Sequence, residues 1–196
     1  MPKTVIIDYD AGNVRSVMNI LSKLGVEAEI TGEAEKILGA DKIIFPGQGH
    51  FKQAMEKLHA QNLVEPIKQV ILDGKSFLGI CLGLQVLFEK SEEAPGVEGL
   101  GIFEGEVKKF TKGKTPQIGW NKIVTTSANT YLSEDYFYFV NSYYVIPKNS
   151  EIIASVANYH IDFCSSVQYK NITAIQFHPE KSSGAGLKFF KKWLQN

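Results

Sequence analysis

Cysteine is scarce in this sequence, and long apolar runs are missing from it. Only Cys81 and Cys164 occur among the 196 residues, too few for a disulfide framework, and neither has the CxxC or paired-histidine spacing of a zinc site. No apolar run approaches the ~20 residues of a membrane span, and the first residues, MPKTVIIDYD, lack the apolar segment of a signal peptide. We therefore expect a cytoplasmic protein with reduced thiols, no metal site and no membrane contact.

Net charge is missing as well. The 21 basic and 21 acidic residues cancel, so no positive field draws the chain to nucleic acid or to an anionic membrane. A hydrophobic content of 44% and a charged content of 21% are ordinary for a globular protein. No Pro/Gly/Ser-rich linker or low-complexity stretch divides the sequence, which predicts a single domain over residues 1–196.

The first half of the chain alternates short β-branched runs with helical patterns. Apolar residues at helical spacing predict a helix over 13–24, and helices are also expected over 61–72 and 82–90. After about residue 100 strand-like runs dominate, up to a last amphipathic helix over 186–194. The predicted fold class is α/β, a three-layer, open and mostly parallel sheet flanked by helices, with added antiparallel strands.

A cysteine turn falls where ligands of open α/β sheets bind, at the carboxyl ends of the parallel strands. Residues 79–83 (GICLG) have the form of a nucleophile elbow between a strand and a helix. A helix N-terminus beside Cys81 favours its thiolate, and the N–H of Leu82 points toward an oxyanion formed on attack. A buried apolar cysteine is the alternative, but the two glycines favour a nucleophile. Cys164 has no turn glycines near it, and we expect it in the core.

A nucleophilic cysteine needs a base, and His178 in the segment QFHPE is the best candidate of the four histidines. It follows the strand-like run ITAI. If the backbone stays extended, His178 and Glu180 project to the same side, so that Glu180 can orient the imidazole. Pro179 fixes its own φ and helps to hold this geometry. A surface histidine beside a solvated glutamate is the alternative for this motif taken alone.

Two further segments allow more than one interpretation. The loop GQGHFK begins like a dinucleotide fingerprint but has Lys52 where the third glycine belongs. We favour a second oxyanion donor beside the Cys81 turn over a nucleotide site. The aromatic run 136–139 (YFYF) lies in an alternating strand without basic neighbours, which favours a core strand, with one ring left for a partner, over a base-stacking surface.

Five separated segments carry a resemblance to a known family: PGQGHF, LFEKSEEAPG, PQIGWN, FVNSYY and QFHPEKS. Together with GICLGLQ they resemble the glutaminase subunits of imidazole glycerol phosphate synthases, within the class I glutamine amidotransferases, over essentially the whole chain. The resemblance implies a flavodoxin-like fold and a triad of Cys81, His178 and Glu180. Such a triad hydrolyses glutamine to glutamate and ammonia through a γ-glutamyl thioester, without a cofactor.

The resemblance also implies a partner and further site residues. One such domain fills the 196 residues, so the ammonia acceptor must lie on another protein. In this family the acceptor is the cyclase subunit, in a heterodimer that makes imidazole glycerol phosphate and aminoimidazole carboxamide ribotide for histidine biosynthesis. The expected oxyanion donors are the N–H groups of Leu82 and Gln48. Residues expected to bind the glutamine head group are Gly49, Gln85, Glu93, Ser142 and Tyr143. Residues expected at the partner interface are Asn13, Trp120, Tyr138 and Lys181.

Two residues depart from the family pattern. Gln48 replaces the valine of a PGVG loop, so we expect a different resting conformation of this loop, and Asn141 stands where a histidine is common. Two alternatives follow: a subunit that supplies ammonia to an enzyme amidating surface sugars, and a non-catalytic regulatory module on the same fold. The complete triad argues against the second.

Overall fold

The computed structural model describes residues 2–10 and 13–196. Its strands are β1 (Thr4–Ile7), β2 (Ala28–Thr31), β3 (Lys42–Gly47), β4 (Ser76–Cys81), β5 (Phe88–Ser91), β6 (Phe103–Lys109), β7 (Gln117–Thr125), β8 (Tyr136–Asn141), β9 (Tyr143–Pro147), β10 (Ile153–Asn158), β11 (Asp162–Tyr169) and β12 (Ile172–Ile175). Its helices are α1 (Val14–Lys23), α2 (Ala34–Leu38), α3 (Phe51–Ala60), α4 (Val64–Leu72), α5 (Leu82–Gln85) and α6 (Ser183–Leu194), with 3-10 turns η1 (Ser150–Ile152) and η2 (Pro179–Lys181).

All strands belong to one sheet, whose main path runs β2-β1-β3-β4-β12-β11-β10-β7-β8. The first five strands of this path are parallel neighbours. Every residue of β1 and β3 is buried, as expected for parallel strands that are covered on both faces. Gly47 at the end of β3 pairs with Cys81 at the end of β4, so the PGQG loop and the cysteine turn leave the sheet side by side.

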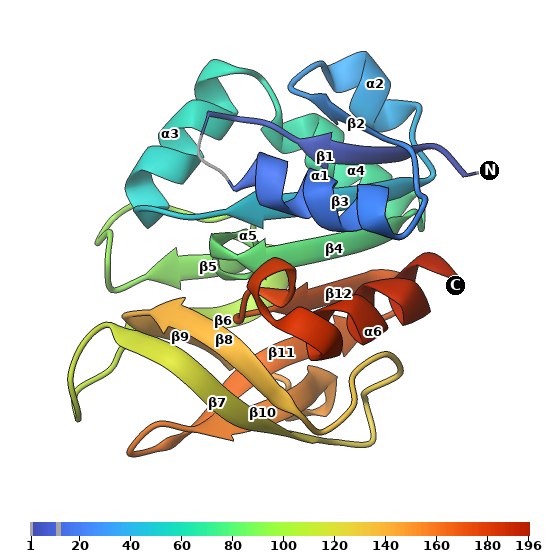
Figure 1. Cartoon of the computed structure of the whole chain (residues 1–196). Coiled ribbons are helices and arrows are strands. Elements are labelled where there is room, and N and C mark those ends of the chain that lie inside the picture. The colour runs from blue at the N-terminus through green and yellow to red at the C-terminus, as the bar shows by residue number, and fades with distance from the viewer. Residues whose placement is uncertain (1, 11–12) are drawn as a thin grey trace.

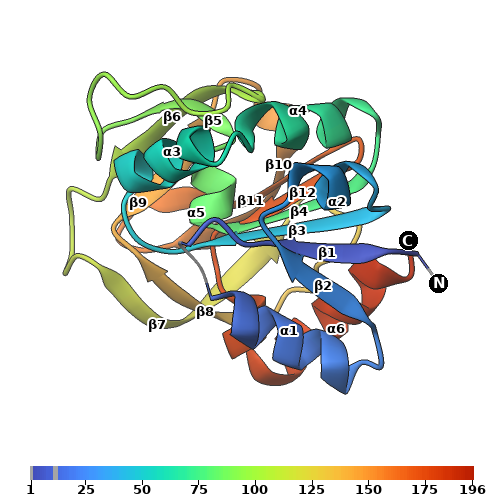
Figure 2. The same cartoon turned by 90° about the horizontal axis from the view of Figure 1, so that it is seen from above.

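Helices cover both faces of the parallel part of the sheet (Figures 1 and 2). Figure 2 shows α1 and α6 on one side and α3 and α4 on the other. Leu21 of α1 and Phe190 of α6 belong to one buried cluster, whereas Leu58 of α3 and Ile67 of α4 belong to a second. The predicted three-layer α/β fold is therefore confirmed, with a sheet that is mixed rather than mostly parallel over the described residues.

The antiparallel strands expected after residue 100 are also present. Strands β11, β10, β7 and β8 continue the sheet beyond β12 with antiparallel pairing. Strands β5, β6 and β9 form a branch that joins β11 through β9. Within the described ranges no helix is long and apolar enough to span a membrane.

The helix predicted over 82–90 is wrong beyond its first turn. Helix α5 ends at Gln85, and strand β5 begins at Phe88. The carbonyl of Leu87 accepts hydrogen bonds from the N–H groups of Ile102 and Phe103, a pairing with a distant segment that local periodicity does not contain. Helix α3 was absent from the sequence prediction, although its buried residues, Phe51, Ala54, Met55 and Leu58, follow helical spacing.

Candidate active site

Cys81 adopts a strained backbone at the junction of β4 and α5. Its φ is 56° and its ψ is −108°, a conformation that non-glycine residues seldom adopt and that is typical of functional sites. A Cβ atom on Gly79 would lie 2.8 Å from the carbonyl oxygen of Gly83, and one on Gly83 would collide with the carbonyl of Phe45. The elbow therefore forms as predicted, because glycines let the backbone pass close to itself.

The helix after the elbow is only one turn long. A single turn aligns few peptide dipoles, so the expected electrostatic support from a helix N-terminus is small here. Any stabilisation of a Cys81 thiolate must come mainly from the side chains around the sulfur.

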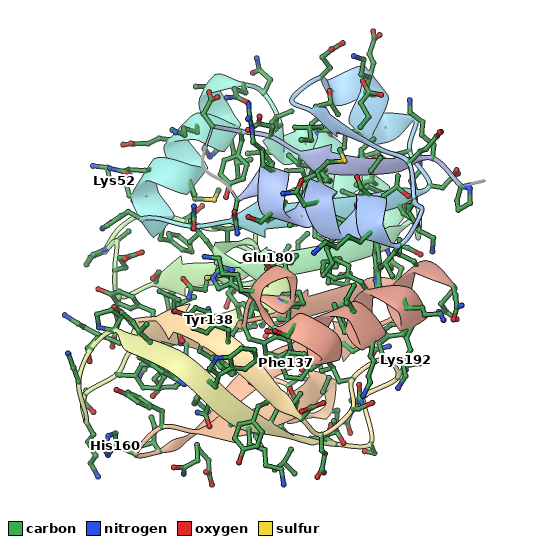
Figure 3. All side chains as sticks on the ribbon, viewed as in Figure 1. Lys52, Phe137, Tyr138, His160, Glu180 and Lys192 are labelled. Carbon is green, nitrogen blue, oxygen red and sulfur yellow. The ribbon has the colours of Figure 1, made fainter. Side chains whose placement is uncertain are left out.

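His178 and Glu180 form a buried pair beside this turn. The Nδ1 atom of His178 lies 2.7 Å from Oε1 of Glu180, and the two side chains are 4% and 1% exposed. The backbone does not stay extended as expected: it enters the 3-10 turn η2 at Pro179, and this turn brings the carboxylate to the imidazole. Figure 3 shows Glu180 on this turn, before α6. The N–H of His178 donates to the carbonyl of Tyr138 on β8 at 2.9 Å.

The electrostatics of the pair favour an imidazolium. Burial by itself lowers the pKa of His178, but the charge of Cys81 and the hydrogen bonds to Cys81 and Glu180 outweigh it and raise that pKa to about 10. Since Nδ1 is taken by Glu180, Nε2 is the atom left for Cys81. The site therefore holds a proton close to the sulfur at neutral pH.

A cavity of about 510 Å³ opens next to Cys81. Of the residues predicted for catalysis, oxyanion binding and substrate binding, all except Glu180 line it, namely Gln48, Gly49, Cys81, Leu82, Gln85, Glu93, Ser142, Tyr143 and His178. Glu180 lies behind His178. Residues from five separate segments of the chain thus meet at one end of the parallel strands.

Gln85 and Glu93 supply hydrogen-bond acceptors to the cavity wall. The Nε2 atom of Gln85 donates to the carbonyl of Tyr143 at 3.2 Å and to Oε1 of Gln176 at 3.0 Å, so Gln85 has only its own Oε1 left. One oxygen of the Glu93 carboxylate accepts from the N–H of Phe51 at 2.7 Å. An amide oxygen and a carboxylate together suit an ammonium group, which has donors only.

The four residues predicted at a partner interface lie in three places. Trp120 is 52% exposed on β7 and stacks edge-on against Tyr138 of β8, while Lys181 lines the cavity. Asn13 contacts the triad, since its Nδ2 donates to Oε1 of Glu180 at 2.8 Å. The sequence gives no signal for the contact between Asn13 and Glu180.

Gln176 was missed although it touches the sulfur. Its Nε2 lies 3.6 Å from Sγ of Cys81, and the residue is fully buried. A signal was present: Gln176 precedes His178 by two residues, so a strand places both on one face, and a glutamine is unusual at a buried position.

Tyr9 was also missed. Its hydroxyl is buried, and burial, with a smaller contribution from the Cys81 charge, raises its pKa. A tyrosine after an apolar strand gives no sequence signal of that placement. Cys164 is a core residue as expected, with its pKa raised to about 12 by burial. Over residues 2–10 and 13–196 no group of His, Cys, Asp or Glu side chains is arranged to hold a metal ion.

Comparison with known proteins identifies one family. The family model described as "Glutamine amidotransferase class-I" matches residues 5–195. A protein of Trichodesmium erythraeum named "Imidazole glycerol phosphate synthase subunit HisH" is 47% identical over 204 residues, covering 99% of this chain and 94% of that protein. A protein of the same name from Rhodopirellula baltica is 43% identical over 194 residues, covering 96% of this chain and 95% of that protein.

Solved structures agree on the fold. One described as "Crystal structure of glutamine amidotransferase" superposes with a TM-score of 0.77 at 18% identity, over 97% of each chain. The structure of PurLQS from Thermotoga maritima gives a TM-score of 0.76, also at 18% identity, over 99% of this chain and 98% of that chain. At this identity the likeness bears on architecture alone.

Proposed function

Because the chain belongs to the class I glutamine amidotransferase family, we propose that it is the glutaminase subunit of an imidazole glycerol phosphate synthase. It hydrolyses glutamine to glutamate and ammonia and delivers the ammonia to a cyclase subunit, with which it forms a heterodimer. The observation that carries this proposal is the placement of Cys81 and the His178–Glu180 pair on the wall of one cavity.

The first half of the reaction forms a thioester. The Cys81 thiolate attacks the side-chain amide carbon of glutamine, and the carbonyl π electrons move to the oxygen. The N–H groups of Leu82 and Gln48, both on the cavity wall, stabilise that oxyanion. The His178 imidazolium donates its proton to the nitrogen while the C–N bond breaks, which releases neutral ammonia and leaves a γ-glutamyl thioester.

The second half regenerates the enzyme. Neutral His178 takes a proton from a water molecule as the water oxygen attacks the thioester carbon. The C–S bond then breaks, glutamate leaves, and the thiolate is restored beside the imidazolium. Glu180 keeps the imidazole oriented through both steps, because its carboxylate holds Nδ1.

Substrate orientation follows from the acceptors that Gln85 and Glu93 place on the cavity wall. The α-ammonium group of glutamine suits Oε1 of Gln85 and the carboxylate of Glu93, which leaves the side-chain amide to reach Cys81. Asn141 helps to hold this wall, since its Nδ2 donates to the carbonyl of Tyr143 at 3.0 Å.

The proposed partner surface lies on the outer face of β7 and β8. Ile118 pairs with Val140, and Trp120 pairs with Tyr138. Ile118 and Trp120 are 63% and 52% exposed, and the carbonyl oxygen of Val140 lies 4.0 Å from Sγ of Cys81. A partner that covers this face would keep ammonia from bulk water, where it would be protonated. The names of the relatives favour the cyclase over a sugar-amidating enzyme as that partner.

We also propose that residues 1–196 form a single domain. The continuous sheet from β1 to β12 and the family match over residues 5–195 support this proposal.

A reconstitution experiment tests the acceptor. The purified chain is mixed with a cyclase subunit and the formimino ribonucleotide that the cyclase uses, and glutamate release is measured. We expect the complete mixture to stimulate glutamine hydrolysis above the rate of the chain alone. Absence of stimulation, in a mixture that still makes product from added ammonium, would rule out this partner.

The nucleophile is tested by Cys81→Ala. The substitution removes the attacking atom, so glutamine-dependent synthesis should fall by roughly 10³-fold or more, while synthesis from ammonium persists. Cys164→Ala makes the same change in the core, away from the cavity, and should keep glutamine-dependent synthesis. Loss of both ammonia sources in the first variant would point to damage of the complex rather than of the chemistry.

A further inference from the structure

Gln176 lies between the nucleophile Cys81 and Gln85 of the cavity wall. It follows β12 directly and is fully buried. Its Nε2 lies 3.6 Å from Sγ of Cys81, within reach of a hydrogen bond to sulfur, and its Oε1 accepts from Nε2 of Gln85 at 3.0 Å. Its backbone N–H donates to the carbonyl of Ser165 at 2.9 Å, so both ends of the residue are fixed.

A backbone carbonyl sets the direction of this series of hydrogen bonds. The carbonyl of Tyr143 can only accept, so the Gln85 atom 3.2 Å from it is the amide nitrogen. That same nitrogen faces Gln176, which must present its oxygen there and therefore turns its own nitrogen toward Cys81. Reversing the Gln176 amide would put two nitrogens face to face. Gln176 is thus fixed as a donor to the sulfur.

We propose that Gln176 is a catalytic residue of the glutaminase, whose side-chain N–H donates a hydrogen bond to the Cys81 sulfur and stabilises its thiolate. The inference rests on the proposed function, because it assigns a role within that reaction. A thiolate is an acceptor only, so an N–H donor favours it over the thiol. The acceptor available to a thiol, the carbonyl of Val140, is 4.0 Å away.

The other groups around the sulfur do not fill this role. His178 gives up its proton during the reaction, and Glu180 reaches the sulfur only through His178. Tyr9 is buried nearby with a neutral hydroxyl, while Glu93 and Lys181 lie on the cavity wall. Helix α5 has a single turn. The Tyr9 hydroxyl is also an uncharged donor, but it makes no hydrogen bond. Gln176 is the uncharged side-chain donor that contacts the sulfur, and it stays in place while His178 cycles. It therefore also stabilises the thiolate as it leaves the thioester.

The test is the pH dependence of Cys81 alkylation by iodoacetamide in the full chain, with mass spectrometry to separate Cys81 from Cys164. Gln176→Met removes the donor at similar side-chain length, and the midpoint should rise by about one pH unit, as expected for losing a hydrogen bond to a charged group. Gln176→Glu keeps the shape but places an acceptor at the sulfur, so its midpoint should rise further. Gln168→Met makes the same exchange on β11, where Gln168 binds the N–H of Thr130, and should leave the midpoint unchanged.

The results distinguish a catalytic role of Gln176 from a packing role, and they test that role separately from the proposed function. Unchanged midpoints in the folded Gln176 variants overturn the proposal. If Gln176→Met does not fold, the isosteric Gln176→Glu decides in the same way. With the partner present, a tenfold lower kcat at similar KM for glutamine supports the role, whereas a raised KM alone contradicts it. Because alkylation needs no glutamine, shifted midpoints in a chain without glutaminase activity refute only the function, and unshifted midpoints in an active glutaminase refute only the Gln176 role.

Discussion

Three different groups meet the Cys81 sulfur: the imidazole of His178, the amide of Gln176 and the backbone carbonyl of Val140. The first carries a proton, the second is a fixed donor, and the third is a distant acceptor. This set places a protonated ring and a fixed amide donor against the sulfur. The buried carboxylate of Glu180, held in turn by Asn13, keeps the ring in place.

We expect the His178 imidazole to titrate near pH 10 in the folded chain rather than near 6.5. The cause is the sum of the Cys81 and Glu180 interactions, which outweighs burial. Imidazole nitrogen NMR measures the midpoint, and Glu180→Gln, which removes the carboxylate charge, should lower it. A midpoint near 6.5 in the unsubstituted chain would contradict the ion-pair description.

The raised pKa of His178 also determines the direction in which the stability of the fold changes with pH. The folded pKa of His178 lies above the unfolded value, so the stabilisation is fully present below about pH 6.5 and is lost as the pH rises through about 10. The difference in unfolding free energy between the unsubstituted chain and His178→Gln should therefore shrink over this window. His59→Gln, an exposed change on α3, should show no such trend. A difference in unfolding free energy that grows with pH would contradict a raised pKa of His178 in the folded chain.

At the scale of elements, the strand-turn-helix junction depends on the contact between α5 and β3. Gly83→Ala places a methyl group against the carbonyl of Phe45, and we expect a loss of about 3 kcal/mol in unfolding free energy because the buried backbone cannot move aside. Gly184→Ala, at the start of α6 with open space around it, should be neutral or stabilising by up to ~1 kcal/mol. Chemical denaturation of both variants measures the contrast, and equal stabilities would refute this account of the elbow.

Elements whose stability is local were predictable from the sequence. The amphipathic helix expected over 13–24 is observed at Val14–Lys23, and the glycines of GICLG form the turn that the motif predicts. The helix expected over 82–90 was shortened by pairing between Leu87 and residues 102–103, which no window around residue 85 contains. The orientation of Glu180 likewise arises from the turn η2 rather than from strand alternation.

The site residues also divide into those that local sequence predicts and those that depend on tertiary contacts. Cys81 and His178 stand in motifs with a chemical reason for each neighbour, and the structure brings them together. Gln176 had a weak signal in its period-two spacing from His178. Asn13 and Tyr9 reach the site only because β1 and α1 pack beside β3 and η2, a tertiary arrangement that a single sequence does not encode locally.

For the whole molecule, the outer face of β7 and β8 is the surface to test. Trp120 projects half-exposed beside Tyr138, and large aromatic side chains commonly dominate binding energy at interfaces. We expect Trp120→Ala to weaken cyclase binding by roughly 30-fold with little effect on folding, measured by titration calorimetry. Leu72→Ala, which removes a 78% exposed apolar side chain at the end of α4, should leave the affinity unchanged. Equal affinities for both variants would move the interface elsewhere.

Strand β8 is a single strand whose two faces have different surroundings. Phe137, Phe139 and Asn141 face inward and are buried, whereas Tyr136, Tyr138 and Val140 are the more exposed set. The side chains of Tyr136 and Tyr138 can therefore differ to fit another acceptor enzyme, while Phe137 and Phe139 maintain the core and Asn141 maintains the cavity wall. A chain with such a strand can be matched to a different acceptor enzyme while its catalytic residues stay the same.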